Sequence, residues 1–331
     1  MKLTTGLAAA CLSAFALNAA AQYTMKLSTP SLNDTNHEWM KQFKAGLEAR
    51  VGSKIKVEIY PANQLGQVPR VQEGISLGTI ELGMSTPGFM GSVEPRFLVT
   101  EIPGLFDGIV HGQQVLADPE MRKRLKTFGE SRNVEPLWIS VNGPAMLLSH
   151  KAVRAVADLQ GLKIRAPGGS PLHVEPLKAL GASPLQVALN DALAAMQNKG
   201  IDGMISGFNI LTSFKYYDIA KDASEVPGSF LIGLGLVSRS FWKTIGPELE
   251  GIVREESIKA ERVFSTFGVE DLERIRAIWR KNGGTIHVFS PAEEKKYVGT
   301  VLSALPPIFA ASPQLKEDYE FFSAMSKKYR K

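Results

Sequence analysis

Short stretches of alternating apolar and polar residues divide the first part of the chain. Residues 25–28 and 55–59 alternate in steps of two, which predicts two strands. Between them, apolar residues recur at helical spacing from Met40 to Val51, and Gly52 is placed to end that helix. This order of strand, helix and strand is typical of a doubly wound α/β lobe. The same pattern predicts a helix over 67–77, a strand over 81–85, a helix over 112–129 and a strand over 136–141.

The pattern restarts after Gly143, which indicates a second lobe of the same kind. Strands are expected over 146–149, 163–165, 201–205 and 229–238, and helices over 171–180 and 191–199. A proline-free, charge-rich stretch over 248–281 is interrupted only by Gly251 and Gly268, and it predicts one long helix or two in line. A helix of that length extends about 50 Å. Because this is longer than one lobe, we expect the helix to brace both.

The strand over 163–165 ends at a position that suits a ligand. Leu162 and Ile164 alternate with basic residues, Pro167 follows at once, and Ser170 then fits the N-cap of a helix. Arg165 therefore lies at the carboxyl end of a strand, and ligands bind at that edge of open α/β sheets. Its guanidinium is a permanently charged, planar fork that matches a carboxylate. The alternative is an ordinary arginine that faces water at the end of a strand.

Polar and aromatic residues follow other predicted strands at the same edge. Because pockets prefer the space between lobes, we expect these loops to line one cleft. Turns favour the same polar residue types, so each loop taken alone also fits a simple turn, and Phe89 and Phe208 also fit the core. The candidate ligand-binding residues are Ser31, Asn33, Ser85, Thr86, Phe89, Asn142, Arg165, Ser206, Phe208 and Asn209.

The first residues have the pattern of a secretory signal peptide. Lys2 gives a positive start, residues 7–17 are apolar, and the alanines at 19–21 form a small-residue cleavage site. We therefore expect residues 1–21 to be removed on export. Cys11 is the only cysteine and leaves with that segment, so neither a disulfide nor a cysteine-bound metal is expected.

Composition and motifs exclude several classes of function. The net charge of +5 is mild and the basic residues are dispersed, so no nucleic-acid binding is expected. The histidines show no metal-ligand spacing, and we expect no metal and no cofactor. Residues 74–78 match G-x-S-x-G, but the serine lies within a predicted helix and not at a strand-to-helix turn. We therefore expect no catalytic activity; a secreted hydrolase is the weaker alternative.

Several segments, in order along the chain, resemble the motifs of one family. They are YPANQLG at 60–66, LGTIELG at 77–83, IPGLF at 102–106, GLKIRAP at 161–167, LGASP at 180–184 and NDALAAMQ at 190–197, followed by IDG at 201–203. The ordered set resembles the DctP-like substrate-binding proteins of TRAP transporters. The resemblance runs from about residue 23 to the C-terminus.

This resemblance implies an α/β, type II-like periplasmic-binding-protein fold with two lobes, a hinge and a long interlobe helix. On the predicted elements, lobe I comprises 22–142 and 232–270, and lobe II comprises 143–231 and 271–331. The implied protein is periplasmic and is expected to be a monomer. It closes around an organic acid, pairs the carboxylate with Arg165, and delivers the acid to the membrane subunits of a permease. A ligand-sensing periplasmic protein that docks on a receptor is the alternative.

Three positions depart from the family's pattern. Ala145 stands where many relatives have a second basic residue, Ser206 where some have a ligand-binding asparagine, and Thr86 where some sugar-acid binders have an acidic residue. An unpaired buried charge is strongly unfavourable. We therefore expect a monocarboxylate with an apolar or aromatic body, such as a 2-oxo acid or an aromatic acid. A dicarboxylate is the alternative if Lys215 or His173 reaches the pocket.

Overall fold

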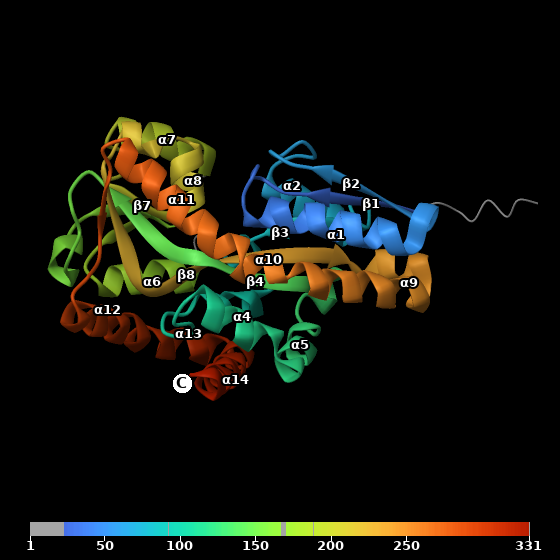
Figure 1. Ribbon diagram of the computed structural model, residues 1–331. Coiled ribbons are helices and arrows are strands. Elements are labelled where there is room, and N and C mark those ends of the chain that lie inside the picture. The colour runs from blue at the N-terminus through green and yellow to red at the C-terminus, as the bar shows by residue number, and fades with distance from the viewer. Residues whose placement is uncertain (1–22, 92, 167–169, 188, 331) are drawn as a thin grey trace, which may run out of the picture.

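The computed structural model describes residues 23–330, except 92, 167–169 and 188. The predicted signal peptide, 1–21, lies outside the described residues. A mixed sheet extends through the molecule (Figure 1). Its strands are β1 Tyr23–Ser28, β2 Ile55–Tyr60, β3 Leu82–Ser85, β4 Val134–Ser149, β5 Lys163–Ala166, β6 Ser183–Gln186, β7 Gly203–Gly207, β8 Asp222–Ser238 and β9 Thr285–His287. The order across the sheet is β2-β1-β3-β8-β4-β7-β5-β6, and β9 pairs with β8.

Two groups of parallel strands lie on either side of a long central pair. β1 pairs in parallel with β2 and β3, and β5 pairs in parallel with β6 and β7. We call these groups the first lobe and the second lobe. β4 and β8 are antiparallel to each other and contribute to both groups. Two neighbouring strands therefore cross between the lobes.

These crossing strands differ from the prediction. We expected separate strands over 136–141 and 146–149, but β4 runs through both. Asn142 and Gly143 do not end it, because the chain passes them as an irregularity in the register between Val141 and Pro144. β8 likewise begins well before the predicted residue 229.

The short strand β6 was not predicted. Its sequence contains Pro184 and lacks clear alternation. β6 pairs with β5 at the edge of the sheet, where a proline is tolerated because an edge strand leaves one row of backbone groups unpaired.

Helices surround the sheet and mostly follow the predicted periodicity. The predicted helix over 112–129 is two helices, because Asp118 and Pro119 form a new helix start: the Asp118 carboxylate accepts hydrogen bonds from the backbone N–H of Glu120 (2.8 Å) and Met121 (3.4 Å). The helices are α1 Thr35–Val51, α2 Val68–Leu77, α3 Pro87–Met90, α4 Ile109–Ala117, α5 Pro119–Leu125, α6 Pro171–Ala179, α7 Leu189–Gln197, α8 Phe208–Ser213, α9 Arg239–Ala260, α10 Arg262–Ser265, α11 Phe267–Lys281, α12 Pro291–Ser303, α13 Leu305–Ala311 and α14 Pro313–Tyr329.

The predicted long helix is the series α9, α10 and α11. The breaks lie at Glu261 and at Thr266, whose φ and ψ of −98° and −82° are not helical. Gly251 and Gly268, the expected interruptions, lie inside α9 and α11. α9 packs on α1 and α11 packs on α8, so the series contacts both lobes as expected (Figure 1).

The C-terminal helix α14 packs on the first lobe. Leu315, Phe322 and Met325 of this helix join a buried cluster that contains Phe97 and Phe128. The sequence-based boundaries assigned 271–331 to lobe II. Those boundaries stay a prediction, but α14, which they assign to lobe II, packs on the first lobe.

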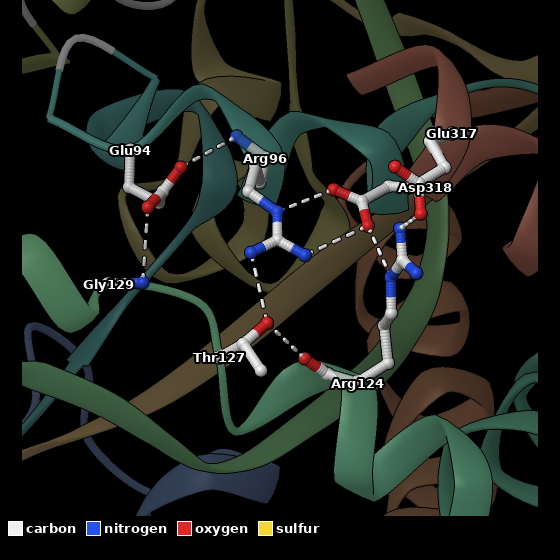
Figure 2. A network of polar contacts seen from close by, with 7 residues as sticks. All are labelled: Glu94, Arg96, Arg124, Thr127, Gly129, Glu317 and Asp318. Carbon is white, nitrogen blue, oxygen red and sulfur yellow. Dashed lines mark hydrogen bonds and ion pairs between the residues drawn. The ribbon is translucent and has the colours of Figure 1, made fainter. Parts of the chain in front are cut away.

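A polar network holds α14 in this place (Figure 2). Arg96, in a 3-10 segment over Pro95–Glu101, donates two hydrogen bonds to the Asp318 carboxylate, at 2.6 and 3.0 Å. Arg124 donates to the same carboxylate (2.7 Å) and to Glu317 (3.0 Å). Asp318 is fully buried, and the Arg96 guanidinium lies 4.1 Å from the ring centroid of Phe128. Two cations therefore share one buried anion between α14 and the first lobe.

Candidate functional site

A pocket lies where both lobes meet the crossing strands. The start of α1 contributes Asp34 to Asn36, and α11 contributes Asp271. Three predicted site residues line this pocket: Asn142 on β4, and Phe208 and Asn209 at the start of α8. Phe208 is also a core residue, because it is buried and its ring centroid lies 5.3 Å from that of Trp279. The structure therefore brings polar groups of the two lobes into one place.

Asp34 connects the two lobes across this pocket. It is the N-cap of α1, and its Oδ1 accepts a hydrogen bond from the backbone N–H of His37 at 3.0 Å. Its Oδ2 accepts from the Ser31 hydroxyl at 2.5 Å and from Asn209 Nδ2 at 3.2 Å. Ser31 and Asn209, both predicted to bind ligand, therefore bind Asp34 in this structure.

Two amide atoms beside the crossing strands lack a hydrogen-bond partner among the described residues. They are Oδ1 of Asn36 and Nδ2 of Asn142. The other amide atom of Asn142, Oδ1, accepts a hydrogen bond from the Ser140 hydroxyl at 2.8 Å. A Cβ atom at Gly233 would lie 2.8 Å from Asn142 Nδ2 and 3.1 Å from Asn36 Oδ1. The glycine therefore leaves space next to one free acceptor and one free donor.

Arg165, on β5, is a buried cation. Arg165 is 4% exposed, and its Nε donates a hydrogen bond to the backbone carbonyl of Val187 at 2.8 Å. No carboxylate among the described residues forms an ion pair with it. Burial lowers the pKa of the guanidinium, and the neighbouring group that acts on it is the phenol of Tyr216. An arginine stays protonated in proteins, so this site holds a positive charge that the described part of the chain does not neutralise.

Two more predicted residues are used in local structure. The Ser85 hydroxyl, almost fully buried, accepts a hydrogen bond from Gln72 Nε2 at 2.5 Å. Asn33 is exposed and has a φ of 56°, and its backbone N–H donates to His37 Nδ1 at 3.1 Å. In these contacts Ser85 stabilises the end of β3, and Asn33 forms part of a turn.

The last three predicted residues, like Arg165, Ser31, Asn33 and Ser85, are not among the residues that line the pocket. Thr86 is the residue before α3, and Phe89 is within that helix. Ser206 lies on β7 opposite Met146. All three are half-buried, and their role in binding stays a prediction.

A dicarboxylate is expected only if Lys215 or His173 reaches the pocket. Lys215 is exposed. His173, on α6, lies with Nε2 at 2.7 Å from Glu101 Oε2, at the end of the 3-10 segment in the first lobe. This contact is a second polar link between the lobes.

Sequence reasoning missed four residues of this region. Asp34 and Asn36 follow the loop that holds Ser31 and Asn33: Asp34 is the N-cap of α1, and Asn36 lies in its first turn. The signal for Asp34 was its place just before a helix. Asp271 lies within the charged stretch of α11, and nothing in the local sequence separates it from its exposed neighbours. Burial raises the pKa of Asp271, while a hydrogen bond from Arg274 opposes that rise. Tyr216, next to Arg165, carried no signal at all.

Membrane spans, metal clusters and a nucleophile elbow are not found among the described residues. Outside the masked positions, no helix combines the length and the apolar character that a bilayer crossing requires. Over the same residues, His, Cys, Asp and Glu side chains form no cluster of three or more that could hold a metal. Ser76, of the G-x-S-x-G match, lies inside α2 and donates to the backbone carbonyl of Arg132 at 2.6 Å.

Known proteins share both the sequence pattern and the fold. The model of the bacterial extracellular solute-binding proteins of family 7, DctP, matches residues 28–310. The 2,3-diketo-L-gulonate-binding periplasmic protein of Escherichia coli (strain K12) is 24% identical over 275 residues, which cover 82% of this chain and 83% of that protein.

Two solved TRAP periplasmic solute-binding proteins superpose on more than nine-tenths of this chain. One, from Desulfovibrio salexigens with bound orotic acid, has a TM-score of 0.86 at 19% identity and covers 93% of this chain and 100% of its own. The other, from Shewanella oneidensis with bound succinate, has a TM-score of 0.82 at 18% identity and covers 92% of this chain and 100% of its own. The predicted two-lobed α/β fold is confirmed. This chain belongs to the DctP family of bacterial extracellular solute-binding proteins and is a solute-binding protein, not an enzyme.

Proposed function

We propose that this protein captures an organic acid in the periplasm through Arg165 and delivers it to the membrane subunits of a TRAP permease. The observation that carries the proposal is the buried guanidinium of Arg165, which forms no ion pair within the described part of the chain. A buried charge without a counterion is strongly unfavourable. A ligand carboxylate supplies that counterion and fits the planar fork. Orotic acid and succinate, bound in the two structural relatives, both carry a carboxylate.

The preferred ligand of this site is a monocarboxylate with an apolar or aromatic body. Ala145, where many relatives have a second basic residue, is buried among apolar side chains of the second lobe. Lys215 is exposed, and His173 is engaged with Glu101. Phe208 supplies an apolar wall. A dicarboxylate is the second candidate, because the Shewanella relative holds succinate.

Isothermal titration calorimetry tests the role of Arg165. Losing one partner of a buried ion pair costs about 3–5 kcal/mol, so Arg165→Ala should weaken the binding of orotate, butyrate or succinate by roughly two to three orders of magnitude. Arg165→Lys should also bind poorly, because an ammonium cannot replace the fork. Arg280→Ala, at an exposed position of α11, is the control and should bind like the wild type. Nearly unchanged affinity in Arg165→Ala would overturn the proposal.

Matched acids test the ligand class. Butyrate and succinate have the same chain length, and they differ in the second carboxylate. The wild-type protein should bind the monocarboxylate more tightly, because a second buried charge would find no cation. Clearly tighter binding of succinate in a competition titration would show that a second cationic group reaches the ligand.

Export can be tested directly. Expression of the full chain in a Gram-negative host, followed by cell fractionation, should recover the protein from the periplasm. Its intact mass should correspond to a chain that begins at Gln22, because residues 1–21 match a cleaved signal peptide. Recovery of the uncleaved chain from the cytoplasm would contradict a periplasmic role.

A further inference from the structure

Arg165 shares its side of the sheet with a buried tyrosine. Arg165 is in register with Met204 of the neighbouring parallel strand β7, so the two side chains point to the same face. Met204 belongs to a buried cluster that also contains Tyr216. Tyr216 is 2% exposed and begins the 3-10 turn Tyr216–Asp218 that follows α8. The guanidinium and the phenol are therefore neighbours in the interior of the second lobe.

Electrostatic coupling supports this proximity. Burial raises the pKa of Tyr216, and the positive charge of Arg165 acts in the opposite direction. The same phenol is the group that acts on the guanidinium of Arg165. A phenol has an ordinary pKa of about 10, so the Tyr216 hydroxyl keeps its proton at neutral pH and can donate a hydrogen bond.

Neither group has the acceptor that its chemistry needs among the described residues. Arg165 has five N–H groups, and the hydrogen bond on Nε goes to the carbonyl of Val187. The Tyr216 hydroxyl donates to no described residue. A guanidinium only donates, so it cannot serve as the acceptor for the phenol. An oxyanion placed between the two groups would accept hydrogen bonds from both.

We propose that the Tyr216 hydroxyl donates a second hydrogen bond to the ligand carboxylate that Arg165 holds, which makes Tyr216 a specificity-determining residue of the site. This inference rests on the proposed function. A neutral hydroxyl adds a donor without adding charge, so the pair offers one positive charge and matches a singly charged carboxylate. A phosphate ester with two negative charges would be left with one charge uncompensated and is disfavoured.

The Tyr216→Phe variant tests this role, because it removes the hydroxyl and keeps the ring. A hydrogen bond to a charged group is among the stronger ones, so affinity for orotate, butyrate and succinate should fall about 10- to 100-fold. Tyr217→Phe is the matched control: Tyr217 is also buried, and its ring packs edge-on against Trp279. Its affinity should stay within about twofold of the wild type, since its hydroxyl has no role in the ligand site.

A second readout separates a ligand contact from a structural role. The ligand-free Tyr216→Phe protein should melt at the temperature of the wild type or above it, because the variant deletes a hydroxyl without a described acceptor. In the Arg165→Ala background, Tyr216→Phe should cause a clearly smaller loss, since both groups hold one carboxylate. A melting temperature that falls together with affinity would assign Tyr216 a structural role and overturn the inference.

The outcomes distinguish the two proposals. If Arg165→Ala loses binding and Tyr216→Phe binds like the wild type, the inference about Tyr216 is wrong and the proposed function stands. If neither variant changes affinity, the carboxylate is held elsewhere and both are wrong. If none of the three acids binds to the wild-type protein, both are wrong as well.

Discussion

At the scale of single residues, the polar side chains around the pocket are of two kinds: those whose hydrogen-bonding groups all have partners and those with donors or acceptors that lack one. The carboxylate of Asp34 and the hydroxyl of Ser85 are fully engaged with their own surroundings. Asn36, Asn142 and Arg165 keep donors or acceptors that no described residue satisfies. Buried polar groups are normally satisfied, so the second set is the one that our proposal assigns to the ligand.

Gly233 tests how tightly that wall is packed. In Gly233→Ala the new Cβ would lie 2.7 Å from Ser140 Oγ and 2.8 Å from Asn142 Nδ2. Overpacking of this kind costs about 1–3 kcal/mol, and urea denaturation should show the loss. Gly251→Ala in α9 is the opposite case, because no atom lies within 4 Å of its Cβ and alanine favours a helix. It should gain roughly 0.5–1 kcal/mol; a loss at Gly251 and none at Gly233 would contradict this account.

The candidate site could be predicted only in part, for a physical reason. Local periodicity places Arg165 near the end of β5 and Asn209 just after β7, and this is why the sequence could single out both as candidates. Whether a side chain is free depends on partners far away in the sequence. Asn209 bonds to Asp34, which lies 175 positions earlier, and no local pattern reveals such a contact.

At the scale of elements, periodicity placed most helices and strands and failed where tertiary packing decides continuity. α1 follows its apolar spacing closely. β4 continues through Asn142 and Gly143 because its antiparallel partner β8 runs beside it on both sides of them. Gly251 and Gly268 stay helical although glycine usually weakens a helix. Residues that usually form turns therefore predicted breaks at these positions, and in the structure the strand and the helices continue through them.

The Asp318 network predicts how firmly α14 is attached. Asp318→Ala would leave Arg96 and Arg124 without their shared buried anion, and breaking a buried pair costs about 3–5 kcal/mol. Glu317→Ala is the control, because the Glu317 side chain is 68% exposed and a surface pair contributes about 0–1 kcal/mol. Chemical denaturation should separate the two variants clearly. Equal stability of both would contradict the network's role.

Asp118 predicts an acid-sensitive contact between α5 and α14. Hydrogen bonds from Lys328 and Tyr329, together with the N-cap bonds, lower the pKa of Asp118 from 3.8 to about 2. Because the pKa is lower in the folded state, this stabilisation is complete only above about pH 5 and is lost as pH falls towards 2. Asp118→Asn should therefore be less stable than the wild type at pH 6 and lose less stability between pH 4 and 2. Parallel acid-unfolding curves for the two proteins would refute it.

At the scale of the whole molecule, the two lobes are joined by continuous strands and by polar contacts that closure can make or break. β4 and β8 fix the lobes to one another without a loop at the crossing. Asn209 with Asp34 and His173 with Glu101 then link lobe surfaces that are far apart in sequence. A hinge bend that opens the cleft must separate such contacts, so they favour the closed state before any ligand contact is counted.

Glu101 offers a test of closure apart from the candidate ligand residues. In Glu101→Gln the contact with His173 weakens, so the closed state becomes less populated and ligand affinity falls by the same factor. One hydrogen bond corresponds to roughly a 2- to 10-fold change. Small-angle scattering should show that orotate makes the wild type more compact and that the ligand-free variant is more open. At saturation both proteins should give the same curve, because the ligand contacts themselves are unchanged. Identical curves with and without ligand in the wild type would show that binding does not close the lobes.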